Sequence, residues 1–576
     1  MRIFRIAGAA IAVFAWLYGF NRFQVFYYQE QFQLFRADAL YLRTFLSQPG
    51  GLAGYAGAFL TQFFVILPVG ALIYTIVLEV LRRSFYKVLA GFITGGALFF
   101  ISLVPVALLL IPIVQIQSNI ASVIGLLCTL PAFLLYRRAN ARWRYAAGAG
   151  LMLAVFFAAA AHVWVLAALI AIHEWFGRRG PSRYPGVALP TALSLLIPWA
   201  AQQWVYTAPI DTSFYACLAW WSVPAIYLLC CLQGPRIAEY FRRRPQVGIA
   251  LSILCLAATL AHVVSKYDRT TETILHIDYE IRHGRYDRAL DIKARTSSDS
   301  RHVLYLANIA LLETGRMPDE MFRFRQAGPA GLFLDRNGSY FSYIYLGEIY
   351  YRLGLMGAAR HCAYESMVAW SQKPNAQTLA QLARIALVEG DFAVCDKYLR
   401  SFEGALFYRS WAGEQRRFLD ERRRNPAFIP PHIPAPVAGL ENFFINYNAP
   451  EAMMKKILEA DSLHRKAFEY LMAFYLLSKD VESAKGLMDR YYAGLGYSAL
   501  PASFEEAMLV YENAVGQPHT YIISANARQR FSQYLRAAQS GANRNWMQQH
   551  YGDTYWFYLH YVQPVPLQTS SESNRY

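Results

Sequence analysis

The chain has 576 residues, of which 55% are hydrophobic and only 16% are charged, which is too apolar for an ordinary soluble protein. Its net charge is +16, and +13 comes from residues 1–264, which hold 19 basic and six acidic residues. Because this excess lies between apolar runs, it indicates membrane topology and excludes nucleic acid as the expected partner.

Nine apolar stretches in residues 1–264 predict membrane-spanning helices. Their expected positions are 4–21, 58–81, 88–114, 119–136, 145–160, 163–176, 187–201, 216–233 and 247–264. The run from Tyr145 to Phe176 is broken only around His162, so it is either a tight hairpin or one long helix. A hairpin places 16 basic residues on one side of the membrane and three on the other, so the positive-inside rule favours it. We therefore expect a bacterial inner-membrane protein with a cytoplasmic N-terminus and a periplasmic segment after Val264.

The segment between the first two apolar runs predicts a helix of its own, at about residues 31–48. Its apolar residues recur at spacings of 3, 4, 3 and 4, at Phe32, Phe35, Ala39, Leu42 and Leu46. Such a stripe is typical of a helix that lies flat in the membrane interface. The sequence "PGG" at 49–51 then turns the chain into the next span.

Residues 265–563 predict pairs of helices with a recurring pattern. Small residues such as Gly347 and Ala359 let two antiparallel helices approach, and larger ones such as Tyr350 fill the gaps between neighbouring pairs. The expected turn glycines are spaced 31, 39 and 36 residues apart, near the roughly 34 of tetratricopeptide repeats, at Gly284, Gly315, Gly354 and Gly390.

The expected fold is therefore all-α, with a polytopic membrane domain over 1–264 followed by an α-solenoid of tetratricopeptide-like repeats. Five prolines between residues 426 and 436 forbid a continuous helix, so a linker at 425–440 separates repeats over 265–424 from a second block over 441–563. The last residues, 564–576, are expected to be disordered.

Several catalytic signatures are absent from the sequence. It contains no GxxxxGK[ST] phosphate loop, no HExxH zinc motif and no CxxC pair. Cys362 and Cys395 lie on the second helices of consecutive repeats, where they form either a disulfide or two buried thiols. His162 is interpreted as a polar turn residue rather than a ligand.

This layout resembles the polytopic C-type glycosyltransferases, some of which carry tetratricopeptide repeats on the same outer side as their first loop. In that class, an acidic residue near the end of the first span is the expected base or metal contact, and the sugar donor is a lipid phosphate. The chain is also similar to an uncharacterised family of Bacteroidota multi-pass membrane proteins that share the pattern "EQ-QLF … PGGL-Y---FLTQFF" and outer helical repeats.

The resemblance implies Glu30 as the catalytic base or the contact for a divalent metal, with Asp38 as the second candidate. Arg36 and Arg43 would contact the donor phosphate. The alternative for Glu30 is an acid that anchors the helix through an arginine pair, and for Asp38 a charge beside an apolar stripe. Further polar residues for substrate binding are Gln62, Gln115, Gln117, Gln202 and Asp211.

Two functions follow from these features. The first is a glycosyltransferase that uses a polyprenyl-phosphate sugar, and the second is a non-catalytic scaffold whose repeats recruit envelope proteins or peptides. A transporter is disfavoured, because the membrane half shows no inverted repeat and few intramembrane charges. A hydrophilic cavity beside Glu30 would favour the enzyme, whereas Glu30 at the surface or in a salt bridge would favour the scaffold.

Overall fold

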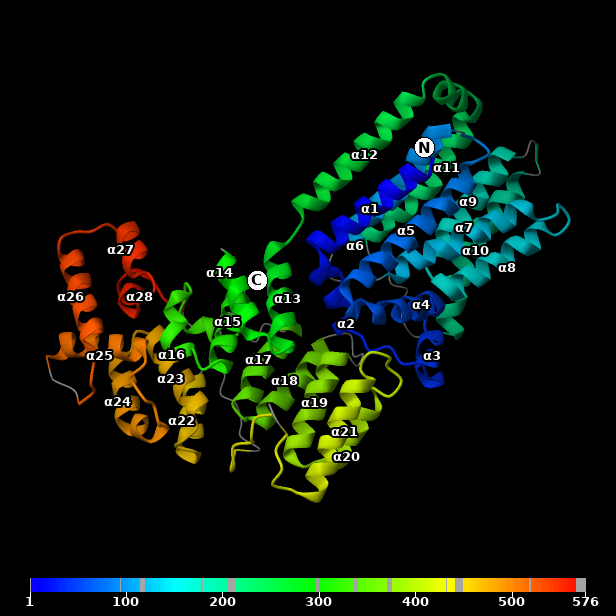
Figure 1. The fold of residues 1–576 in the computed structure, drawn as a ribbon. Coiled ribbons are helices and arrows are strands. Elements are labelled where there is room, and N and C mark those ends of the chain that lie inside the picture. The colour runs from blue at the N-terminus through cyan, green and yellow to red at the C-terminus, as the bar shows by residue number, and fades with distance from the viewer. Residues whose placement is uncertain are drawn as a thin grey trace. The chain divides into compact units, whose positions relative to one another are not determined.

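The computed structural model describes residues 2–565, except for 94, 114–119, 178–179, 182, 206–213, 297, 299, 335–339, 370–374, 431–432, 441–448 and 517–519. Every regular element in this described part is a helix, which confirms the all-α prediction (Figure 1). Contacts divide the chain into two compact units. The first unit contains Met1–Asp268 and Ser401–Ser410, and the second contains Arg269–Arg400 and Trp411–Tyr576.

The first unit is a helical bundle. Its helices are α1 (Arg2–Phe20), α2 (Tyr28–Gln31), α3 (Ala39–Leu46), α4 (Gly51–Thr61), α5 (Leu67–Leu89), α6 (Gly95–Ile113), α7 (Ala121–Arg138), α8 (Arg144–Ala159), α9 (His162–Gly177), α10 (Arg183–Trp204), α11 (Phe214–Arg243) and α12 (Pro245–Ser265). Helices α5, α7 and α9 contribute Tyr74, Phe133 and Leu166 to its core, and all three side chains are fully buried. Long apolar helices thus pack against one another through aromatic and branched side chains.

The outward faces of these helices are apolar as well. On α5, Leu72, Ile76 and Val80 are 49%, 53% and 46% exposed, and their spacing of four places them in one stripe. On α10, Leu195 and Trp199 are also exposed. A water-soluble helix normally carries polar residues on the face turned away from the core. The exposed faces of these helices therefore carry large apolar side chains.

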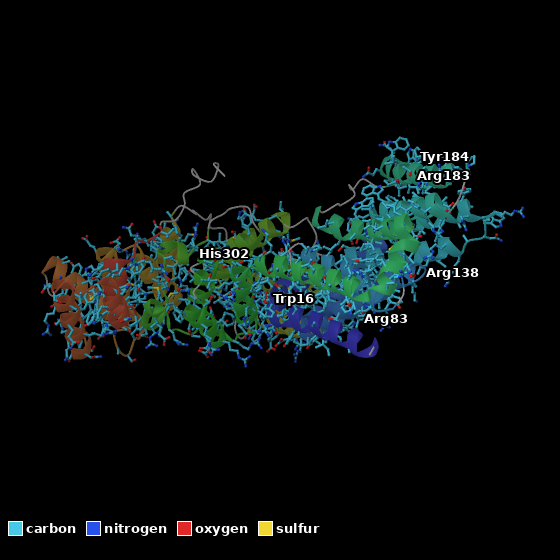
Figure 2. All side chains as sticks on the ribbon, turned by 90° about the horizontal axis from the view of Figure 1, so that it is seen from above. Trp16, Arg83, Arg138, Arg183, Tyr184 and His302 are labelled. Atoms are coloured by element: carbon cyan, nitrogen blue, oxygen red, sulfur yellow. The ribbon has the colours of Figure 1, made fainter. Side chains whose placement is uncertain are left out.

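The run over 145–176 is a hairpin of two helices, as the basic clusters favour. Helix α8 ends at Ala159, Ala160 takes a positive φ of 44°, and α9 begins at His162. The chain reverses there, and Figure 2 shows Arg138 and Arg183, which flank the hairpin on either side, at the same end of the first unit.

The single span expected over 58–81 is wrong. The chain forms α4, a 3-10 turn over Gln62–Val65 and then α5, with extended backbone at Ile66 (φ −99°, ψ 92°). Pro68 follows within the first turn of α5, where its missing N–H costs no hydrogen bond. Helix α5 also extends eight residues beyond 81, through Arg82, Arg83 and Lys87 to Leu89.

Nine full-length spans are not supported either. In the described part, two helices, α7 and α10, are long and apolar enough to cross a membrane. Seven other apolar helical stretches are shorter. Helices α8 and α9, for example, have 16 residues each and reach only about 24 Å, against the roughly 30 Å of a hydrocarbon core.

The helix expected over about 31–48 is shorter in the structure. Helix α2 ends at Gln31, residues 33–37 are not helical, and α3 begins only at Ala39. Asp38 explains the late start, because its carboxylate accepts a hydrogen bond from the Tyr41 amide at 2.7 Å and caps α3. The stripe is broken as a result: Phe32 and Phe35 are buried, whereas Leu46 is exposed.

The second unit consists of helices that pack largely as consecutive pairs. They are α13 (Arg269–Arg282), α14 (Tyr286–Arg295), α15 (Arg301–Glu313), α16 (Met317–Glu320), α17 (Tyr340–Arg352), α18 (Met356–Ala369), α19 (Ala376–Glu389), α20 (Phe392–Arg400), α21 (Arg409–Arg424), α22 (Pro450–Ala460), α23 (Arg465–Leu477), α24 (Val481–Tyr491), α25 (Ala502–Val515), α26 (Ala525–Gln539), α27 (Arg544–Tyr551) and α28 (Tyr555–Tyr561). The four expected turn glycines all have φ between 66° and 80°, a conformation that suits glycine. That these pairs are tetratricopeptide-like repeats stays a prediction.

Two local expectations in the second unit can be compared with the structure. Cys362 and Cys395 are two buried thiols. Gly347 lies so close to the next helix that a Cβ atom there would approach Cys362 Cβ to 3.1 Å.

Residues 433–438 of the proline-rich segment are not helical, and Val437 N–H donates to the Gly354 carbonyl at 3.2 Å. The helical blocks on both sides of this segment belong to the second unit, and the subdivision between them stays a prediction.

Candidate functional site

The candidate site lies where the chain leaves α1. Asn21 departs from helical geometry, with φ −126° and ψ 23°, and Arg22–Tyr27 then forms a π-helix that leads into α2. Phe26 in this segment packs on Phe64 and Tyr74, with ring centroids 5.3 and 6.0 Å apart. Short π-helical turns are rare and occur often at functional sites. This π-helical segment places Glu30 at the end of a buried stretch of chain.

Glu30 is buried, with only 4% of its surface exposed. Its Oε1 accepts a hydrogen bond from the Tyr408 hydroxyl at 2.5 Å, and its Oε2 accepts one from Gln31 Nε2 at 2.6 Å. Burial raises the pKa of Glu30 to about 7, while the hydrogen bonds from Tyr408 and Gln31 act in the opposite direction. Both oxygens are therefore held by neutral donors, and the carboxyl gains and loses its proton near neutral pH.

Tyr408 belongs to Ser401–Ser410, a segment distant in sequence that is nevertheless part of the first unit. We call this segment the docking loop. The Gly404 carbonyl accepts from the Ala37 amide at 3.2 Å, and Phe407 meets Phe63 with ring centroids 5.7 Å apart. A Cβ atom on Gly404 would lie 3.3 Å from the Ala37 nitrogen, so the backbones approach closely there. The docking loop thus covers Glu30 through polar, backbone and aromatic contacts.

Tyr408 is the residue of this site that sequence reasoning misses. It lies 378 positions from Glu30, and nothing in its local sequence distinguishes it from the other 39 tyrosines. The arginine partner considered for Glu30 is not what the structure shows. A tyrosine hydroxyl and a glutamine amide take that place instead.

The second candidate acid, Asp38, has a structural role. One carboxylate oxygen caps α3, and the other accepts from Arg36 Nε at 2.8 Å. Arg36, expected to contact a phosphate, is thus paired with Asp38. Arg43 is exposed in the last turn of α3. The structure therefore brings Arg36 and Asp38 together, but as partners of each other.

The remaining candidates are spread over the first unit. Gln62 donates from Nε2 to the carbonyl of Phe59 at 2.9 Å, within its own turn of helix. Gln202 is exposed near the end of α10. Gln115, Gln117 and Asp211 lie outside the described residues. Glu79, in contrast, pairs with Arg82 and Arg83 at 2.7 and 2.8 Å, as its position predicts.

Neither metal-ligating side chains nor the two cavities described below add residues to the site around Glu30. Within the described residues, no cluster of three or more histidine, cysteine or acidic side chains could hold a metal ion. Two cavities, of about 540 and 200 Å³, have walls made entirely of residues from the second unit, and Glu30 lines neither of them.

The fold and this site define an all-α protein with an apolar-surfaced helical unit, a buried carboxyl beneath a docking loop and a second helical unit. A family model covers residues 1–562, and the chain belongs to this family, the family of unknown function DUF6057. No curated protein and no solved structure matches the chain.

Proposed function

We propose that the chain is an integral protein of the bacterial inner membrane that acts as a scaffold. Its first unit is embedded in the bilayer with the N-terminus in the cytoplasm, and its second unit recruits envelope proteins on the periplasmic side through a solenoid of helical repeats. The observation that carries this proposal is the apolar exterior of the first unit, including the exposed stripe of Leu72, Ile76 and Val80. Such a surface is a liability in water and a requirement in lipid.

The geometry around Glu30 supports a structural role over a catalytic one. A general base must reach the hydroxyl that it deprotonates, within hydrogen-bond distance. Both oxygens of Glu30 already accept short hydrogen bonds, and the docking loop covers the carboxyl. Arg36, which would stabilise a leaving phosphate, neutralises Asp38 instead. We infer that Glu30 holds the docking loop against the segment that follows α1.

One observation favours the glycosyltransferase as a second candidate. The pKa of Glu30, at about 7, lies in the range in which a carboxylate serves best as a general base near neutral pH. Catalysis on a polyprenyl-phosphate sugar would require Tyr408 to release the carboxyl and the docking loop to move, so that the acceptor hydroxyl could enter. A divalent metal at Glu30 would require the same displacement.

Reporter fusions in a bacterial host test the proposed topology. Alkaline phosphatase fused after Asp268 should be active, because the second unit is periplasmic, whereas the same fusion after Asn140 should be inactive. A fluorescent protein that folds only in the cytoplasm should show the opposite pattern. Alkaline phosphatase activity at Asn140 together with none at Asp268 would reverse the orientation and overturn the proposal.

A further inference from the structure

A groove in the second unit has the size and the lining of a ligand site. Its larger part is a cavity of about 540 Å³ between Phe322–Gln326 and the helices α26 to α28. A second cavity of about 200 Å³ shares four of the same lining residues, Arg325, Gln326, Arg544 and Val562. The two cavities therefore adjoin each other through this shared lining, and we treat them together as one groove, whose larger part is within the range of small-ligand pockets. We call it the arginine groove.

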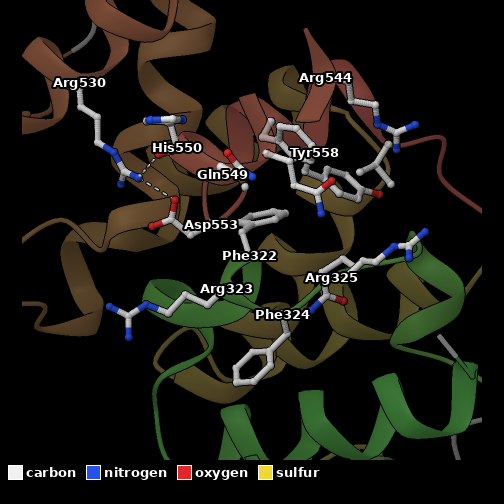
Figure 3. Close-up of a pocket in the computed structure, with 15 residues that line it drawn as sticks. Phe322, Arg323, Phe324, Arg325, Arg530, Arg544, Gln549, His550, Asp553 and Tyr558 are labelled. Atoms are coloured by element: carbon white, nitrogen blue, oxygen red, sulfur yellow. Dashed lines mark hydrogen bonds and ion pairs between the residues drawn. The ribbon is translucent and has the colours of Figure 1, made fainter. Parts of the chain in front are cut away.

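The charge of the arginine groove is strongly one-sided. Its larger cavity is lined by Arg323, Arg325, Arg530 and Arg544 and by a single acid, Asp553. Asp553 pairs with Arg530 at 2.6 Å, and Arg323 pairs with Glu320, which lies outside the lining, at 3.4 Å. Figure 3 shows Arg530 and Arg323 on one side of the cavity, and Arg325 and Arg544 extending together on the other. The positive charge is thus spread along the groove rather than focused at one point.

The remaining lining is neutral and offers hydrogen bonds. Gln548 and Gln549 are exposed on α27 and present amide groups that both donate and accept. Phe324 and Tyr558 add aromatic surface. Guanidinium groups recognise oxyanions in a planar, two-pronged geometry, and amides of this kind pair with a peptide backbone.

We propose that the arginine groove binds an acidic peptide segment of a partner protein, with carboxylates on the arginines and backbone amides on the glutamines. A compact phosphate would need several guanidinium groups around one point, whereas Arg325 and Arg544 lie across the cavity from Arg323 and Arg530 (Figure 3). Acid groups spaced along an extended chain match this separation. The inference deepens the scaffold function and rests on it.

Binding to the purified full-length protein in detergent tests the proposal. The probe is a fluorescent peptide of alternating glutamate and glycine, compared with a matched peptide of glutamine and glycine, and inorganic phosphate serves as competitor. The acidic peptide should bind at least about tenfold more tightly than the neutral one, and its affinity should fall as salt is added. Phosphate at the same concentration as the peptide should displace little of it.

Substitutions locate the site. The double variant Arg325→Gln/Arg544→Gln should weaken binding at least about tenfold. The control Arg536→Gln, an exposed arginine of α26 that lines neither cavity, should bind as wild type does. Gln549→Glu adds a negative charge at an exposed helix position without disturbing the core, and it should also weaken binding. This variant keeps the test decisive if the double variant fails to fold.

Three results would overturn the proposal. They are equal binding of the two peptides, wild-type affinity in Gln549→Glu, and complete displacement by an equal concentration of phosphate, which would define a simple oxyanion site. The peptide-binding result does not depend on membrane orientation, because the assay uses detergent-solubilised protein. The result of the reporter fusions does not depend on the arginine groove. The failure of either proposal can therefore be recognised separately.

Discussion

Gly125→Ala should severely destabilise the first unit, by about 3 kcal/mol or more. A Cβ atom on Gly125 of α7 would lie 2.3 Å from His162 Cε1 and 2.5 Å from Nδ1. The His162 ring cannot easily move away, because its two nitrogens contact the carbonyls of Ala159 and Ser122 at 2.8 and 3.0 Å. Its face also packs on Trp220, with centroids 4.2 Å apart. The thermal midpoint of the purified protein in detergent measures this effect.

A matched glycine separates this clash from general effects of alanine in a helix. Gly150 lies in α8 with nothing within 4 Å of its added Cβ, so Gly150→Ala should be neutral or stabilising by up to about 1 kcal/mol. His162→Ala should recover part of the loss when it is combined with Gly125→Ala. Equal midpoints for Gly125→Ala and Gly150→Ala would show that the His162 ring does not occupy this site.

The attachment of the docking loop should weaken as the pH rises. The Glu30 carboxyl has a pKa of about 7 in the folded protein and 4.5 when it is solvated. Burial therefore favours the protonated carboxyl. Below pH 4.5 the carboxyl is protonated in both the folded and the unfolded state, so burying it costs no stability. Between pH 4.5 and about 7 the free energy of unfolding falls progressively, because the unfolded state ionises before the folded state does. The full difference is about 3 kcal/mol. Glu30→Gln cannot ionise and should remove most of this pH dependence.

Hydrogen-exchange protection at the Ala37 amide measures how firmly the loop is attached, because this amide donates to Gly404. Protection should be greater at pH 5 than at pH 8 in the wild type and nearly constant in Glu30→Gln. Tyr408→Phe should reduce protection at both values by about 1–3 kcal/mol, because a buried acceptor loses its donor. Tyr364→Phe, which removes a hydroxyl from an exposed tyrosine pair, is the control. Equal protection in Tyr408→Phe and Tyr364→Phe would contradict the proposed attachment.

Apolar periodicity and charge predicted much of the first unit but failed where one residue changes the backbone. The hairpin over 145–176 followed from the distribution of arginines, a long-range constraint that local pattern lacks. The break at Ile66 had a signal, because Pro68 lacks a backbone donor and suits the start of a helix, but the signal is not decisive, since α7 continues through Pro131. Asp38 also had a signal, since an aspartate before an apolar turn is a common helix cap.

The site was less predictable than the fold. Glu30 was identified from its place after the first apolar run, but its environment depends on Tyr408, which is distant in sequence. No local pattern reveals such a pair. The arginine groove was equally hidden from local sequence patterns. Arg325 and Arg544 come together only when the segment before α17 packs on α27 and α28. Contacts of this kind arise from tertiary packing and not from periodicity.

The measurement that tests the scaffold account most directly is a profile of protein and lipid glycans in the native host. Strains carrying Glu30→Gln, Tyr408→Phe or a deletion of the whole protein would be compared with wild type at equal expression. If Glu30 fastens the docking loop and performs no chemistry, every glycan of the wild type should persist in Glu30→Gln. If Glu30→Gln is expressed normally and lacks a glycan that is also missing from the deletion strain, while Tyr408→Phe retains it, Glu30 is a catalytic base and the scaffold account is wrong.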